Sequence, residues 1–288
     1  MRKISINLIL ILSLNISAQE ILPLKERAEV INEIQYDRLT NLLPNIMKKN
    51  NIDMWVIMTR EYNEDPVIKT MLPPTWLNAR RRTILVFSIN EKTGKFKSVA
   101  ITRYPFGKNI PSIWVKEEQP DQLKALSDYI QKENPKKIGI NISKYESLSD
   151  GLSKNAYDEL YKSLSKKFQN RLVSAEKLSI AWIETRTSLE MKVFSKLVEI
   201  SNNIIREAFS SKVITPGITT TDDVVWWMRE KVIEMGIKTW FHPTVDIQRK
   251  DGSDLYAFDG KSKFDIIQPG DIIHCDFGIT CLLYTSDA

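Results

Sequence analysis

Short apolar runs alternate with segments of helical periodicity through the first half of the chain, and this alternation constrains the fold more than any single motif. The runs IDMWVIMT, TILVFSI and SVAIT predict strands, and the break NEKTGK between the last two is typical of a hairpin turn. Two further strand-like runs, KKIGINI and RLVSA, follow among helical segments at residues 24–51, 120–133 and 155–168. Strands that alternate with helices predict an α/β domain.

The second half, which begins near residue 175, opens on the longest helix signal in the chain. In TRTSLEMKVFSKLVEISNNIIREAFSS, Thr187 and Glu190 have the spacing of a capping box, in which each side chain satisfies a backbone N–H that the helix leaves unpaired. A second amphipathic helix, VVWWMREKVIEM, ends before Gly236, and its Trp226 and Trp227 are expected to anchor the core. WFHPTVDIQ and IIHCDFGI then predict two strands, with QPGD as the turn before the second.

Asp276 is the most informative polar residue, because it lies inside the apolar run DIIHCDFGI. A carboxylate in such a strand is unfavourable unless it is paired or binds a metal ion. Gly278, two residues later, lets another backbone or a ligand approach closely. Strand alternation places Ile272, His274 and Asp276 on one face, so His274 could approach the same site. An outward-facing position on a half-buried strand explains Asp276 equally well, and a surface position on an edge strand is the simpler interpretation of His274.

The N-terminus, MRKISINLILILSLNISAQ, has a basic start, an apolar stretch and small residues before Gln19, which is the pattern of a signal peptide cleaved after Ala18. The apolar stretch is shorter than the roughly 20 residues that cross a bilayer, which disfavours an uncleaved membrane anchor. We therefore expect a signal peptide at residues 1–18 and a periplasmic or secreted mature chain without membrane attachment. Cys275 and Cys281 are the two cysteines of the sequence, so no disulfide framework is expected.

The 288 residues carry a formal net charge of +5, and 42% of them are apolar, which is enough for a sizeable core in two domains. The densest basic run, Arg80-Arg81-Arg82, precedes a predicted strand and is expected to be a solvated strand edge. Neither zinc-ligand spacing nor a nucleic-acid-binding motif accompanies this run. We therefore expect no nucleic-acid partner.

The order of these signals resembles the pita-bread metallopeptidase superfamily, to which methionine aminopeptidases, prolidases and Xaa-Pro aminopeptidases belong. The capped helix, the turn TPGITTTDD, the second helix and QPGDIIHCDFG follow one another in the order of that family. The preceding region resembles the creatinase-type N-terminal domain, which accompanies the prolidase and Xaa-Pro aminopeptidase branch. The resemblance implies a mixed-sheet α/β domain at residues 19–175 and the first part of an α+β pita-bread catalytic domain at residues 176–280.

The resemblance also implies a metal site. In this family the aspartate of the strand Gly-Asp…Asp-Phe/Ala-Gly is a metal ligand, a role that falls on Asp276. A second aspartate on the partner strand, a histidine and two glutamates complete a site for two divalent ions, with Mn²⁺ expected and Co, Zn or Fe as alternatives. Two such ions activate a bridging water for amide hydrolysis. Family members also carry a substrate-facing histidine before the first aspartate. Here that region contains Asp259, so His242, which lies further back, is the candidate substrate contact.

The last eight residues, CLLYTSDA, back-translate to a nucleotide sequence that resembles a transposon-end adapter. We therefore expect residues 281–288 to be a non-native tail and the natural sequence to continue differently after about Thr280, the alternative being a genuine divergent C-terminus. Asp287 lies eleven residues after Asp276, which is the family spacing of the second ligand. Because it falls in the tail, it is left out of the site. The remaining ligands would then lie in a longer parent protein, and this truncated chain is expected to be inactive.

These observations predict a metal-dependent exopeptidase that hydrolyses a peptide bond next to proline, acting on peptides with proline near the N-terminus, with a homodimer as one possible assembly. Two other functions stay open. One is a non-catalytic pita-bread protein that binds peptides or serves as a scaffold. The other is a creatinase-type C–N hydrolase, which does not use the metals. Asp276 argues against both alternatives.

Overall fold

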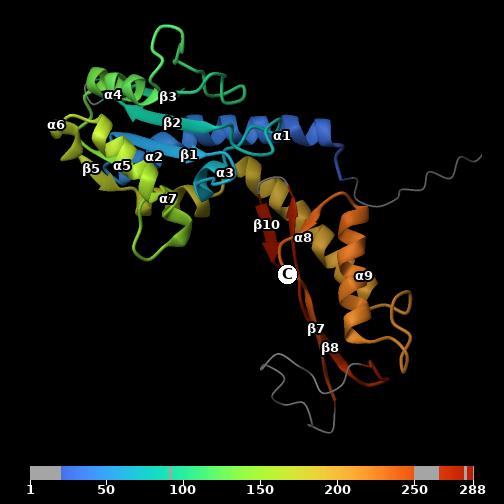
Figure 1. The fold of residues 1–288 in the computed structure, drawn as a ribbon. Coiled ribbons are helices and arrows are strands. Elements are labelled where there is room, and N and C mark those ends of the chain that lie inside the picture. The colour runs from blue at the N-terminus through green and yellow to red at the C-terminus, as the bar shows by residue number, and fades with distance from the viewer. Residues whose placement is uncertain (1–20, 91–92, 250–265, 282–283, 288) are drawn as a thin grey trace, which may run out of the picture.

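The computed structural model describes residues 21–90, 93–249, 266–281 and 284–287, with the backbone alone for residue 281 and for 284–287. The predicted signal peptide and Asp259 lie outside the described residues. Figure 1 shows two units: a sheet unit at residues 24–184 and a helix–ribbon unit at residues 188–287. Within the described residues, no helix combines the length and the apolar character that crossing a membrane requires.

Five strands of the sheet unit form one mixed sheet in the order β3-β2-β1-β4-β5. The strands are β1 (Met54–Arg60), β2 (Arg82–Ile89), β3 (Phe96–Ala100), β4 (Ile138–Ile140) and β5 (Leu172–Ser174). β2 is antiparallel to β1 and β3, whereas β4 is parallel to β1 and β5. This arrangement confirms the predicted α/β class and mixed sheet, and the β2–β3 hairpin lies where NEKTGK predicts a turn.

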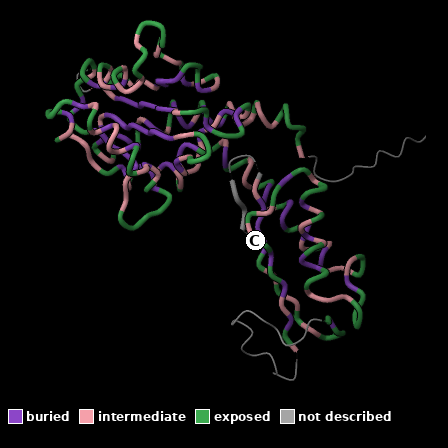
Figure 2. The backbone as a smooth tube through the Cα atoms, viewed as in Figure 1, coloured by how far each residue is buried: buried purple, intermediate pink, exposed green. Residues whose placement is uncertain are grey.

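Helices cover both faces of this sheet, because its central strands are apolar on both faces. Trp55 and Ile57 of β1 face one core, and Met54 and Val56 face the other. The first core includes residues of α2 (Leu43–Lys49), α3 (Pro66–Lys69) and α7 (Glu176–Glu184). The second includes residues of α4 (Gln122–Glu133), α5 (Lys154–Ser163) and α6 (Lys166–Gln169). A short 3₁₀ turn, η2 (Ser147–Ser149), precedes α5. The strands are accordingly the most continuously buried part of the chain in Figure 2.

The first predicted helix contains a π-helical turn. α1 (Leu24–Asp37) continues into η1 (Arg38–Leu42) and then into α2. At the end of the π turn, the backbone N–H of Leu43 donates to the carbonyl of Arg38, five residues back. Pro44 follows and has no N–H to donate, so an uninterrupted α-helical ladder is impossible here. The π turn, with its hydrogen bond between residues five apart, accommodates the donor that Pro44 lacks.

Two parts of the sheet unit differ from the sequence prediction. The single helix predicted at residues 155–168 is divided into α5 and α6, because Leu164 adopts an extended conformation and buries its side chain in the core. The helix α7 was not predicted. Leu178 and Trp182 of α7 pack into the core of the sheet unit. The division between domains at residue 175 stays a prediction.

The helix–ribbon unit packs two long helices against two small sheets. The helices are α8 (Ser188–Ala208) and α9 (Thr221–Glu234), each with a capping box at its start. The strands are β6 (Lys238–Thr239), β7 (Thr244–Gln248), β8 (Ile272–Asp276), β9 (Gly278–Cys281) and β10 (Tyr284–Asp287). β7 and β8 form an antiparallel ribbon, and β10, β9 and β6 form a second sheet. α8, α9, β7 and β9 contribute to a third core, which also contains Ile34 of α1.

Two predictions for this unit are wrong in detail. The run IIHCDFGI forms two strands, because Phe277, fully buried in the core, separates β8 from β9 and the two strands pair with different partners. Trp226 does not anchor the core, since its side chain is 49% exposed. Trp227 packs partly against the core. The stripe of α9 that faces the core consists of Val224, Val225, Met228 and Val232.

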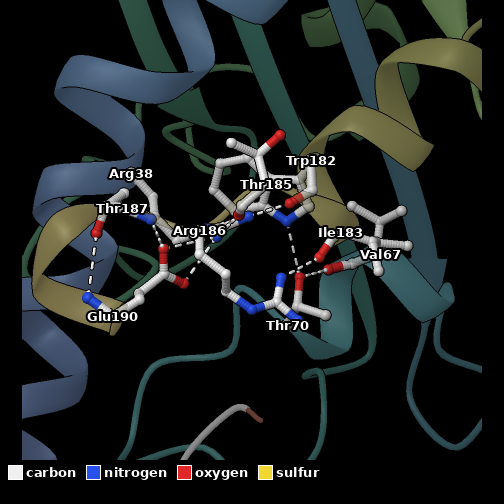
Figure 3. A network of polar contacts seen from close by, with 9 residues as sticks. All are labelled: Arg38, Val67, Thr70, Trp182, Ile183, Thr185, Arg186, Thr187 and Glu190. Carbon is white, nitrogen blue, oxygen red and sulfur yellow. Dashed lines mark hydrogen bonds and ion pairs between the residues drawn. The ribbon is translucent and has the colours of Figure 1, made fainter. Parts of the chain in front are cut away.

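A buried ion pair joins the two units. Arg38 donates from Nη1 to both carboxylate oxygens of Glu190, at 2.7 and 3.0 Å, and both side chains are almost completely buried. The guanidinium lies 4.1 Å from the ring centroid of Trp182 and also donates to the carbonyls of Trp182 and Thr185. Glu190 is at the same time the capping-box residue of α8 (Figure 3). The first turn of α8 is therefore fixed to the N-terminal helix and to the end of α7.

Candidate functional site

The β7–β8 ribbon has one apolar and one polar face. The register pairs Thr244 with Asp276 and Asp246 with His274. Side chains of Val245, Ile247, Ile273 and Cys275 contact the core of the helix–ribbon unit. Because strand residues alternate between faces, Thr244, Asp246, His274 and Asp276 share the opposite face, which points to solvent. The structure thus confirms that His274 and Asp276 lie on one face.

Asp276 is the last residue of β8 and its side chain is exposed. The unfavourable burial that the apolar run implied therefore does not arise: the carboxylate is on the solvent face while its neighbours Cys275 and Phe277 face inward. Directly after it, the chain passes through the buried Phe277 into β9. Asp276 therefore lies at the point where the ribbon ends and the second small sheet begins.

Asp246 lies beside His274 and is not among the candidate site residues predicted from the sequence. Nδ1 of His274 is 3.9 Å from Oδ2 of Asp246, a distance that forms an ion pair when the imidazole is protonated. The His274 side chain is 65% exposed, so the pair contributes little to stability. Asp246 is two residues after Thr244 in the predicted strand WFHPTVDIQ, so both side chains are expected on the same face. Thr244 lies opposite Asp276, and Asp246 therefore shares the face of Asp276.

His242 lies just before β7, in a cluster of side chains from α9. Its ring meets the ring of Trp226 edge to face, with centroids 5.4 Å apart. Nη1 of Arg229 lies 3.4 Å from Nδ1 of His242, and the same guanidinium lies 5.1 Å from the Trp226 ring centroid. His242 is exposed and is two residues before Thr244, the partner of Asp276. The structure therefore puts both predicted site residues at the same end of the ribbon, without a direct contact between them.

Backbone hydrogen bonds hold this end of the ribbon. The N–H of Trp240 donates to the carbonyl of Gly278 at 2.9 Å, and β6 pairs with β9 in the same sheet. On the other side of β9, Asp287 of β10 is opposite Gly278. Gly278 thus lies between two neighbouring chain segments, as the absence of a side chain at this position allows.

The opposite end of the ribbon is closed by an arginine–carboxylate pair. Arg249, directly after β7, donates from Nε and Nη2 to the two oxygens of Asp271, at 2.9 and 3.1 Å. Asp271 also accepts from the N–H of Gln268 at 2.7 Å, which closes the predicted QPGD turn, and Gly270 in that turn has φ +92°. The hydrogen bond from Arg249 lowers the pKa of Asp271. This bidentate pair fixes the register of the ribbon that carries Asp276.

Cys275 does not have the features of a nucleophilic cysteine, which are an accessible thiol and a lowered thiol pKa. Its side chain is on the core face of β8. Burial raises the pKa of its thiol, and the neighbouring Asp276 carboxylate raises it further. A thiol with a raised pKa holds less of the reactive thiolate at neutral pH. The chemistry of this site therefore rests on the exposed carboxylates and imidazoles of the polar face.

The donors on the polar face suit a hard divalent ion in type, since carboxylates and imidazoles bind Mn²⁺-like ions. Their number does not suffice: within the described residues, no three His, Cys, Asp or Glu side chains gather closely enough to hold a metal ion. A two-ion centre needs several ligands at fixed geometry. The role of Asp276 as a metal ligand therefore stays a prediction.

Comparison with known proteins identifies the fold. No protein-family model and no curated protein matches the chain at the level of sequence. Among solved structures, the X-Pro aminopeptidase from Thermotoga maritima MSB8 superposes with a TM-score of 0.58 at 16% identity, over 84% of this chain and 63% of that one. Aminopeptidase P from E. coli with the inhibitor Pro-Leu gives 0.51 at 10% identity, over 92% and 61%. The prolidase from Pyrococcus furiosus gives 0.50 at 16% identity, over 85% and 63%.

These likenesses show that the chain has the fold of Xaa-Pro aminopeptidases and prolidases, which confirms the fold that the resemblance in the sequence implies. The chain spans less than two thirds of the length of these structures.

Proposed function

We propose that this chain is part of a metal-dependent exopeptidase that cleaves a peptide bond next to proline. The observation that carries the proposal is the shared fold, together with an exposed aspartate at the end of β8, next to Gly278. The proteins that share the fold are an X-Pro aminopeptidase, an aminopeptidase P and a prolidase. Their identities of 10–16% support a common architecture, and the activity is our inference from it.

Asp276 is the metal ligand of this proposal. Its carboxylate is exposed on the polar face, so the metal-free protein holds it ionised without the cost of burying an unpaired charge. The buried Phe277 and the Arg249–Asp271 pair fix the ribbon on which it lies. Ligands on rigid elements are held within the narrow range of geometry that metal sites need. The remaining ligands of two divalent ions, with Mn²⁺ as the expected metal, would be supplied by a longer parent protein.

His242 is the proposed substrate contact. The edge of its ring meets Trp226, and Arg229 approaches its Nδ1, so that the imidazole is oriented from two sides. Trp226 is half exposed beside it and offers an apolar surface for a proline ring. Neutral imidazole can accept or donate a hydrogen bond to a peptide group. The substrate would be a peptide with proline near its N-terminus. We further propose export through the signal peptide at residues 1–18, for which an exported protein beginning at or near Gln19 is the test.

The test of the proposed function uses the protein encoded by the complete gene, with the substitution Asp276→Asn. The amide lacks the negative charge, so the bound Mn²⁺ and the hydrolysis of an Xaa-Pro peptide should both fall sharply. Asp158→Asn is the control, since it makes the same chemical change in a partly exposed aspartate of α5, outside the ribbon, and should leave the metal content unchanged. Metal content and turnover of Asp276→Asn equal to wild type would refute the role of Asp276.

The same measurement separates the alternatives. A scaffold protein would bind peptides without hydrolysing them, and a creatinase-type C–N hydrolase would act on a guanidino compound without a metal requirement.

The 288-residue chain by itself should show no peptidase activity whichever divalent metal is added, because one carboxylate cannot hold two ions against water. Mn²⁺-dependent cleavage by this chain would contradict that expectation and would return Asp287 to the site.

A further inference from the structure

A basic hollow lies in the sheet unit, away from the ribbon that carries Asp276. Its volume is about 760 Å³, within the range of small-molecule sites. It is formed where the β1–β2 connection meets the segment between β3 and α4. Five cationic and two acidic side chains line it, together with three aromatic ones. The cationic members are Arg80, Arg81, Arg82, Arg103 and Lys116.

The two acidic residues of the hollow are engaged elsewhere. Oδ1 of Asp121 accepts from the N–H groups of Leu123 and Lys124, at 2.9 and 3.2 Å, and so caps α4. Oε2 of Glu61 accepts from the N–H of Arg81 at 3.1 Å. Neither carboxylate forms an ion pair with a cation of the hollow among the described residues. Both carboxylates keep their charge, so five cationic against two acidic side chains leave the lining with a formal excess of three positive charges.

Four cations of the hollow have no acidic partner in the described part of the chain. Arg82 pairs with Glu159 outside the hollow, at 3.1 Å. No carboxylate lies within ion-pair distance of the other four in that part, which are Arg80, Arg81, Arg103 and Lys116. Arg103 and Lys116 are exposed as well. Like charges held close together without counter-charges repel one another, so an anion bound among them would be stabilised.

Arg80 is held in position by aromatic rings. Its guanidinium carbon lies 4.8 Å from the ring centroid of Trp76 and 5.8 Å from that of Tyr104. Trp76 is itself fixed edge to face against Phe106, with centroids 5.1 Å apart. A guanidinium held over aromatic faces keeps its N–H fork free for a carboxylate or a phosphate. Less rotamer entropy is then lost when an anion binds.

The backbone at the rim of the hollow is in an unusual conformation. Arg81 and Tyr62 have φ values of 51° and 65°, in the left-handed region that non-glycine residues rarely adopt. The N–H of Glu61 donates to the carbonyl of Arg81 at 2.6 Å, and the carboxylate of Glu61 accepts from the N–H of Arg81. Strained residues of this kind persist where the surroundings fix them, and they cluster at ligand sites.

We propose that the basic hollow binds a small organic anion that carries at least two phosphate or carboxylate groups. Four cations without an ion pair among the described residues come from two separate chain segments, and they suit a ligand with more than one oxyanion group. Tyr104 is 55% exposed and provides a ring face for a flat part of the same ligand. A small molecule is favoured over a nucleic acid because the basic residues elsewhere in the sequence are scattered and do not extend the hollow into a stripe. This site is independent of the proposed peptidase function.

The test is calorimetric titration of the whole 288-residue chain at low ionic strength, with pyrophosphate and with citrate as separate probes. The two probes distinguish phosphate from carboxylate as the preferred oxyanion. At least one probe should bind with a stoichiometry of one, and its affinity should fall as salt is added. Arg103→Gln and Arg80→Gln should each weaken binding by about tenfold to a hundredfold, since each removes a hydrogen-bond donor that carries charge.

Lys154→Gln is the matched control, because Lys154 is an exposed cation of α5 outside the hollow, paired with Asp158 at 2.6 Å. It should leave the affinity unchanged. Arg103 is exposed and has no ion pair among the described residues, so its replacement should not disturb folding, which circular dichroism can verify. Failure of both probes to bind, equal affinity of wild type and Arg103→Gln, or binding of long DNA alone would each overturn the proposal.

Discussion

The substitution Glu190→Gln tests how the two units are held together. The carboxylate of Glu190 accepts two hydrogen bonds from Arg38 and one from the N–H of Thr187, at 2.6 Å. Replacing one oxygen by an amide nitrogen removes the negative charge. It also places an N–H donor next to the guanidinium of Arg38, which has no acceptor for it. Arg38 then stays buried, with 6% of its side chain exposed, without a counter-charge.

The expected loss of stability follows from that burial. Removal of one partner of a buried ion pair typically destabilises a protein by about 3–5 kcal/mol, because the other charge is left uncompensated. Glu199→Gln on the same helix is the control. Glu199 lies 3.2 Å from Lys196, and both side chains are more than half exposed, so this change should cost less than about 1 kcal/mol.

The assay is urea unfolding of both variants and of wild type, with circular dichroism as the probe and the slopes compared before free energies are derived. Hydrogen exchange of the amides in the first turn of α8 gives a local measure, since Glu190 also caps this helix. A Glu190→Gln variant that loses no more stability than Glu199→Gln would refute the reasoning, because it would mean that the pair contributes no more than a surface contact.

Three further predictions concern local structure. Gly151→Ala should destabilise by about 1–3 kcal/mol or more, measured by urea unfolding, because the new Cβ would lie 2.1 Å from Oδ2 of the buried Asp65. Trp182→Ala should destabilise by about 3–5 kcal/mol, whereas Trp226→Ala should change little, since these side chains are 1% and 49% exposed. Because Arg249 lowers the pKa of Asp271, the stability that this pair adds is present above the unfolded value of about 3.9 and is lost as pH falls through the folded-state pKa. Asp271→Asn should therefore flatten the acid limb of the curve of stability against pH, and an unchanged limb would contradict this.

Features of local origin could be predicted from the sequence. The capping box of Thr187 and Glu190 involves residues three apart, and both of its hydrogen bonds are present. The shared face of His274 and Asp276 follows from the period of two that every strand has. The resemblance found in the sequence also identified the fold, because it rested on the order of several such local signals.

Features that depend on distant contacts could not be predicted in this way. The ion pair of Arg38 and Glu190 joins residues 152 positions apart, and no periodicity encodes their contact. Trp226 was expected in the core because α9 carries apolar residues around much of its circumference, and which of them face inward depends on packing against α8 and β7. Similarly, the break at Phe277 arises because β8 and β9 pair with different strands.

The candidate site was predictable only as single residues. Asp276 and His242 are candidates from the sequence alone, and their roles stay predictions. The neighbours Asp246 and Arg229 become apparent only when β7, β8 and α9 are assembled. The basic run at Arg80 was interpreted as a solvated edge, since its aromatic partners are separated from it in sequence or belong to another segment.

Proline-selective hydrolysis by the protein of the complete gene is the most direct test of the central claim. The rate of release of the N-terminal residue would be measured for a matched pair of peptides, one with proline and one with alanine at the second position, with and without Mn²⁺. We expect cleavage of the proline peptide alone, dependent on added metal and lost on chelation. Equal cleavage of both peptides, or cleavage that survives complete removal of metal, would contradict the account.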